Sequence, residues 1–116
     1  MKEDKLKTSS YAFALRIVAM SRYLNDQREY VLSKQVLRSE TSIGANVTEA
    51  RQAESKRDFL HKLAIANKEA FETEYWLNLL RDSSYISAIQ AESLIADCNA
   101  PQRMLVSSLK ILKSNN

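Results

Sequence analysis

The chain has almost none of the residues that interrupt helices: one glycine, Gly44, and one proline, Pro101, among 116 residues. In a helix interior these residues cost about 1 and about 3 kcal/mol relative to alanine, so their scarcity favours long helices with short connections. A chain of this length is one domain, long enough to bury a real core. We therefore expect a single all-α domain over residues 1–116.

Further absences exclude whole classes of protein. No apolar run is long enough to span a bilayer, so we expect no membrane partner. No apolar segment follows Met1–Lys5, which argues against a secretory signal. The only cysteine, Cys98, excludes an internal disulfide and fits a reducing, cytoplasmic location. His61 is the only histidine, and a metal site needs more ligands than this residue can supply.

Apolar residues recur at intervals of three and four along four segments, as expected for helices with one buried face. These segments cover residues 9–26, 33–53, 56–82 and 87–113. Tyr11 and Leu15 widen the apolar face of the first, which predicts that it touches two neighbours. Four such helices joined by short loops predict an antiparallel up-down-up-down bundle.

Local signals mark helix ends and irregularities. Ser33 is a good N-cap residue for the second helix, and Ser55 with Asp58 has the form of a capping box at the start of the third. Ser87 and Gln90 repeat that form before the fourth helix. Gly44, inside the second helix, suggests close approach of another helix. Pro101 predicts that the fourth helix is kinked or split near this residue.

No group of residues predicts a reaction or a cofactor. The chain has no nucleophile with its base, no glycine-rich phosphate loop and no set of metal ligands, so we expect no catalytic residue, no metal and no enzyme activity. Cys98 lies on an apolar seam and is expected to be a buried, inert thiol. The polar residues assigned to helix register are Asn46, expected to bond across to the third helix, together with Glu49 and Asp58.

The formal charge of +3 leans mildly towards anionic partners. Arg51, Lys56 and Arg57 cluster around the junction between the second and third helices. They form either a solvated bundle end or an anion-binding corner. Lys34 and Arg38 are further candidates for contact with phosphate.

Three sequence patterns carry a resemblance to a known family. They are S-I-x-x-N-x-x-E-[GA], D-F-x-x-x-L-x-I-A and E-x-E-x-x-L, and the matching residues are Ser42, Ile43, Asn46, Glu49, Asp58, Phe59, Leu63, Ile65, Ala66, Glu72, Glu74 and Leu77. The chain resembles the bundle proteins encoded in intervening sequences of bacterial 23S ribosomal RNA genes. It departs from many members at Ala50, where they carry glycine, and at Lys68 and Glu69, where they carry Gly-Ser.

The resemblance implies a four-helix bundle without enzymatic activity, and several members form ring-like homopentamers. A related accessory protein of diversity-generating retroelements is a basic pentamer that binds a reverse transcriptase and nucleic acid. A pentamer of this chain would carry a formal charge of +15, five times the +3 of one copy.

Two functions follow as hypotheses. The first is an oligomer that associates with RNA or DNA through its basic residues. The alternative is a protein-interaction scaffold or accessory subunit without nucleic-acid binding, for which a second apolar face around Trp76 and Leu79 would provide the contact.

Overall fold

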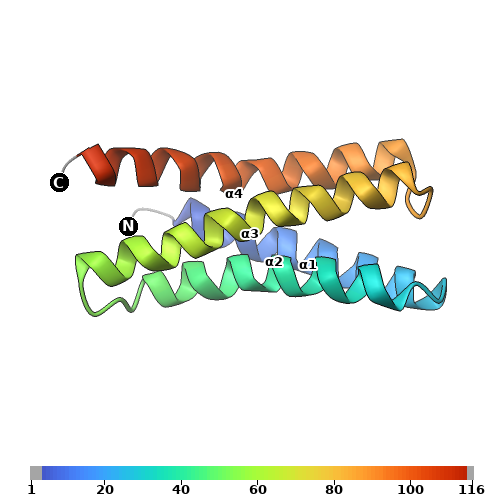
Figure 1. The fold of residues 1–116 in the computed structure, drawn as a ribbon, viewed down its shortest axis with the longest axis horizontal. Helices are drawn as coiled ribbons and strands as arrows, with labels where there is room; N and C mark the ends of the chain where they lie inside the picture. The colour runs from blue at the N-terminus through green and yellow to red at the C-terminus, as the bar shows by residue number, and fades with distance from the viewer. Residues whose placement is uncertain (1–3, 115–116) are drawn as a thin grey trace.

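The computed structural model describes residues 4–114, which form four helices joined by short connections (Figure 1). They are α1 (Lys5–Asp26), α2 (Tyr30–Ala50), α3 (Lys56–Asp82) and α4 (Ala88–Ser114). The prediction of an all-α fold is confirmed. The first two helices begin earlier than the sequence predicted, and α2 ends three residues sooner.

Side-chain caps explain where the helices begin. Ser55 Oγ accepts the backbone N–H of Asp58 at 3.0 Å, and Ser87 Oγ accepts that of Gln90 at 3.1 Å, as predicted. Ser33 was wrongly predicted to cap α2. The cap is Glu29, whose carboxylate accepts the backbone N–H of Leu32 at 2.9 Å. Ser33 instead lies inside the helix, with its Oγ buried 2.6 Å from that of Ser21.

Two helices end in turns that normally contain glycine. Arg28 after α1 and Ser84 after α3 adopt left-handed backbone angles, with φ of 64° and 68°. In each turn the following residue donates its N–H back into the last helical turn: Glu29 to the Leu24 carbonyl and Tyr85 to the Leu80 carbonyl, both at 2.9 Å. This is the Schellman arrangement, which reverses the chain direction within a few residues.

Each helix packs against the helix that follows it, and α1 also packs against α4, which closes the bundle. The buried apolar residues form two clusters. The first joins the later part of α1 and α3 to the beginning of α2 and α4. The second joins the beginning of α1 and α3 to the end of α2 and α4. Successive helices therefore run in opposite directions along the bundle (Figure 1).

Between the two clusters every helix contributes a buried polar residue. We call this set the central polar layer, and its members are Ser10, Ser39, Glu40, Thr73 and Gln102. Along each helix these residues fall where the buried stripe passes from one cluster to the other. The hydroxyl groups of Ser39 and Thr73 form a hydrogen bond with each other, with their oxygens 2.8 Å apart.

Pro101 lies in the same region, buried within α4. The helix is assigned without interruption from Ala88 to Ser114, so the expected split does not occur. The proline has no N–H to donate to the Asp97 carbonyl. A bend of the helix axis at this position stays a prediction.

Candidate functional site

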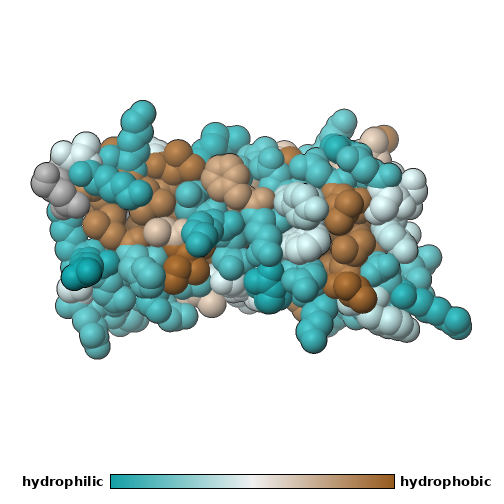
Figure 2. Space-filling view, viewed as in Figure 1, coloured by the Kyte–Doolittle hydropathy of each residue, from teal (hydrophilic) through white to brown (hydrophobic). Residues whose placement is uncertain are grey.

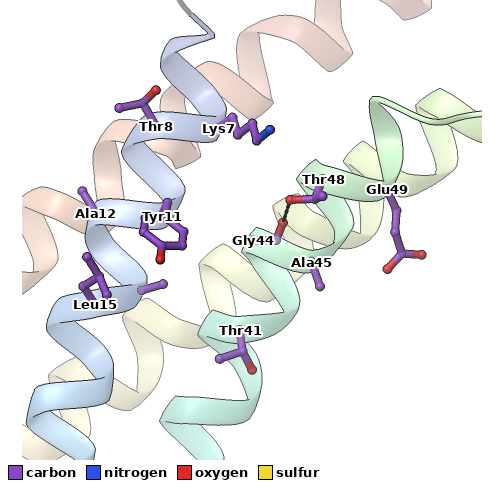
Figure 3. Close-up of a pocket in the computed structure, with 11 residues that line it drawn as sticks. Lys7, Thr8, Tyr11, Ala12, Leu15, Thr41, Gly44, Ala45, Thr48 and Glu49 are labelled. Carbon is purple, nitrogen blue, oxygen red and sulfur yellow. Dashed lines mark hydrogen bonds between the residues drawn. The ribbon is translucent and has the colours of Figure 1, made fainter.

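A depression on the surface of the bundle lies between α1 and α2 (Figure 3). It has a volume of about 910 Å³ and a mainly apolar lining. Tyr11 and Leu15 project from α1, and Gly44 lies across from them on α2 (Figure 3). Both α1 side chains are well exposed, at 67 % and 57 %. We call this surface the α1/α2 groove, and its lining residues are Lys7, Thr8, Tyr11, Ala12, Ala14, Leu15, Thr41, Gly44, Ala45, Thr48 and Glu49.

Small side chains on α2 create the groove. Thr41, Gly44, Ala45 and Thr48 follow one another at helical spacing along its wall. The sequence suggested that Gly44 marks the close approach of another helix. Within residues 4–114 no other helix approaches this residue closely. A Cβ atom built at this residue would meet nothing within 4 Å. As the sequence predicted, α1 touches two neighbours, α2 and α4. Tyr11 and Leu15, which suggested this, are themselves largely exposed.

A second apolar surface lies on α3. Phe71 and Tyr75, one helical turn apart, are 54 % and 60 % exposed and form a ridge that we call the α3 ridge. Trp76 and Leu79, which the sequence suggested as the free apolar face, are both half-buried. Trp76 packs against the first cluster and supports Tyr75 edge-to-face, with ring centroids 5.1 Å apart.

The face of the molecule shown in Figure 2 carries apolar patches towards both ends, separated by hydrophilic side chains.

Two of the five predicted phosphate-binding residues are held by carboxylates. Arg51 donates to both oxygens of Asp4, at 2.6 and 2.9 Å, and its guanidinium lies 6.0 Å from the centre of the Phe59 ring. Arg38 donates to Glu72 at 2.6 Å and to Glu69 at 3.4 Å. Such partners reduce the positive potential that either arginine offers to a phosphate.

The remaining three, Lys34, Lys56 and Arg57, are exposed and form no ion pair within residues 4–114. Lys56 and Arg57 open the first turn of α3. Lys34 lies near the opposite end of α2, about 25 Å from Arg51 along the helix at 1.5 Å per residue. The five cations therefore do not converge on one patch. Of these five residues, only Lys56 and Arg57 are neighbours that form no ion pair with a carboxylate among residues 4–114.

The three residues assigned to helix register make different kinds of contact. The Asn46 amide does not reach α3; it donates to the carbonyl and hydroxyl oxygens of Ser42 in its own helix, at 2.9 and 3.1 Å. Glu49 accepts from Lys62 of α3 at 2.9 Å, so it does link two helices, at the surface. Asp58 completes its cap by accepting the backbone N–H of Glu54 at 3.2 Å.

On one outer face of α2 and α3, Arg38 interacts with two carboxylates, Glu69 and Glu72. The hydrogen bond from Arg38 lowers the pKa of Glu72. Burial and the neighbouring Glu72 raise the pKa of Glu69 despite the same arginine. Because Arg38 lies between the two carboxylates, this trio links the helices and offers no free acid and base pair.

The remaining candidate side chains are isolated. Cys98 is buried in the first cluster, which raises its pKa to about 12, and it donates weakly to the Ala70 carbonyl. The predicted burial of this thiol is confirmed, and its low reactivity stays a prediction. His61 is exposed on α3. Residues 4–114 contain no group of three or more His, Cys, Asp or Glu placed to hold a metal ion.

Neither apolar surface was predicted from the sequence. Their signal was present: Tyr11 and Leu15 are spaced by four and lie off the stripe of Phe13 and Ile17. Phe71 and Tyr75 have the same spacing and lie off the buried stripe of α3. Large apolar residues on a second helix face indicate either a wider core or an external contact, and only the packing distinguishes the two.

The helix packing and the two surfaces define a four-helix bundle with exposed apolar faces. The chain belongs to the 23S rRNA-intervening sequence protein family, which residues 2–107 match. It is similar to a protein of unknown function from the S23 ribosomal protein family of Bacteroides thetaiotaomicron VPI-5482. That crystal structure is 52 % identical, with a TM-score of 0.88 over 90 % of this chain and 98 % of the other. No curated protein matches the chain. Within residues 4–114 every helix is too short or too polar to cross a membrane.

Proposed function

We propose that this protein is a non-enzymatic subunit that assembles with copies of itself, with the α3 ridge of one copy seated in the α1/α2 groove of the next. The observation that supports this proposal is that the protein exposes both an apolar groove walled by small residues and a ridge of two large aromatic residues. The groove wall is built of small residues at helical spacing, and the ridge presents Phe71 and Tyr75 one turn apart. Ridges of this spacing pack into such grooves when helices meet.

The proposed contact joins two different surfaces, so it is heterologous and leaves one groove and one ridge free on every pair. Contacts of this kind close into rings or continue as filaments. The family resemblance, which implies ring-like homopentamers, favours a ring. The repulsion between copies of formal charge +3 is modest and is screened by salt.

Light scattering after size exclusion tests this assembly. We expect the wild-type protein to exceed the 13.2 kDa of one chain. Leu15→Glu in the groove and Tyr75→Glu on the ridge should each give monomers, because a buried unpaired carboxylate opposes association. The control is Ile89→Glu, which changes an 80 % exposed residue outside both surfaces and should leave the assembly intact.

Mixing the two monomeric variants separates a heterologous contact from a symmetric one. Leu15→Glu retains an intact ridge and Tyr75→Glu retains an intact groove, so the mixture should form a heterodimer with one sound interface. A wild-type monomer would overturn the proposal. So would a mixture that stays monomeric, since the intact ridge of one variant would then fail to bind the intact groove of the other.

The second candidate function is association of this assembly with nucleic acid through Lys56 and Arg57. Their exposure without a carboxylate partner favours it, and assembly would repeat the pair in every subunit. Each phosphate contact adds about −0.9 to the slope of log affinity against log salt on a duplex. Lys56→Gln with Arg57→Gln should flatten that slope in fluorescence anisotropy with a short RNA duplex, whereas Lys34→Gln should alter it less. Equal slopes in all three proteins would exclude this surface, leaving the protein-interaction subunit.

A further inference from the structure

The central polar layer contains a carboxyl group in the middle of the bundle. Glu40 has an exposed fraction of 0 %, and neither carboxylate oxygen has a hydrogen-bond partner among the described residues. Two other members of the layer are also unpartnered there, Ser10 at its Oγ and Gln102 at its Nε2. A charged carboxylate in such a place loses its hydration without compensation.

Among residues 4–114, no cation forms an ion pair with Glu40. The buried stripes of α1 and α3 hold apolar residues, serines and a threonine, and none of these titrates near neutral pH. The buried stripe of α4 contains one titratable group, the thiol of Cys98. On α2 the nearest cation in sequence is Arg38, whose guanidinium pairs outward with Glu69 and Glu72. The carboxyl group therefore has no salt-bridge partner inside the bundle.

We propose that Glu40 is a proton-linked switch at the centre of the bundle. With its proton in place the carboxyl group is neutral, and the four helices close over the central polar layer. When the proton leaves to solvent, the carboxylate must regain water, and α2 opens away from the layer at its midpoint. The device lies inside the bundle and is independent of the groove, the ridge and the basic residues.

The direction of the pH effect follows from burial. Desolvation raises the pKa of Glu40 from 4.5 to about 8 in the folded protein. Between these values the folded chain keeps a proton that the unfolded chain has released, so the unfolded state binds fewer protons and stability falls as pH rises. Stability from this group is full below pH 4.5 and lost by about pH 8. The unfolding equilibrium constant should rise about tenfold per pH unit across this window.

Urea unfolding from about pH 5 to about pH 9 tests the switch by comparing wild type with Glu40→Gln, which keeps the shape but cannot ionise. We expect the wild type to lose stability across this range and Glu40→Gln to lose much less. The matched control is Glu92→Gln, a change at an exposed carboxylate of α4, which should retain the wild-type pH profile. Identical profiles for wild type and Glu40→Gln would overturn the proposal.

Two measurements keep the test independent of whether Glu40→Gln folds. The first is carbon-13 NMR titration of the Glu40 carboxyl in the wild-type protein, expected to show a midpoint near pH 8; a midpoint near 4.5 would refute the switch. The second is hydrogen exchange. Protection of the amides around Glu40 should fall above that midpoint while the ends of α2 change less, and uniform protection would contradict local opening.

Discussion

Gly44→Ala should stabilise the folded monomer. Gly44 lies in the interior of α2, where replacing glycine by alanine gains about 1 kcal/mol because fewer unfolded conformations are available to alanine. The added Cβ has open space, since apart from the adjoining backbone of its own helix no atom lies within 4 Å of its position. The hydrogen bond from Thr48 Oγ1 to the Gly44 carbonyl, at 2.9 Å, uses the backbone and survives the change.

The gain corresponds to a roughly fivefold smaller unfolding constant, and to a rise in Tm of about 4 °C for a chain of this size. Urea unfolding should be measured in the Leu15→Glu background, so that self-association through the groove does not contribute. Ala45→Gly is the matched control, because it places a glycine at the next position of the same helix and should lose about as much as Gly44→Ala gains.

The double variant should then be close to neutral. A loss of about 1 kcal/mol in Gly44→Ala would refute the reasoning, because it would mean that the Cβ meets an obstacle in the folded monomer. A gain in the monomer accompanied by weaker assembly of the wild-type background would instead indicate that another chain approaches Gly44 closely.

Two other predictions concern backbone turns and the thiol. Arg28→Gly and Ser84→Gly should each stabilise the protein by about 1 kcal/mol in urea unfolding, because glycine adopts the left-handed conformation without the steric penalty of a side chain; a loss at either residue would show that its side chain contributes more than the strain. Cys98 should react with a thiol reagent at about pH 8 only as fast as the protein unfolds, since burial disfavours the thiolate. Rapid labelling of the native protein would contradict its burial.

Helix ends were predicted correctly where the residues that fix them lie close together in the sequence. Ser55 and Ser87 capped the helices they were expected to cap, because an N-cap needs only a side-chain oxygen and a backbone N–H three residues later. The prediction failed at Ser33. The chain turns into α2 at Arg28, which adopts a left-handed backbone conformation. Glycine is the usual residue for this conformation, so the arginine gave no sign of the turn in the sequence.

Predictions that depended on a partner from another helix were less successful. Arg51 and Arg38 looked like free cations, yet they lie beside Asp4 and Glu72, 47 and 34 residues away in the chain. Asn46 was expected to reach α3 but had a nearer acceptor on Ser42, one turn earlier in its own helix. A pairing between distant residues depends on how the helices rotate about their axes, and the periodicity of one helix does not specify this.

The sequence by itself determined that the chain is a four-helix protein with apolar seams, because helix propensity and the spacing of apolar residues act within a few turns. The tertiary structure alone decided which apolar residues remain outside, which cations are neutralised and which carboxyl group is enclosed. Glu40 illustrates the difference. Its spacing from Val36 and Ile43 puts it on the buried stripe of α2, but the sequence does not show whether another helix supplies a partner for its carboxyl group. Only the packing of four helices around the central polar layer removes it from water.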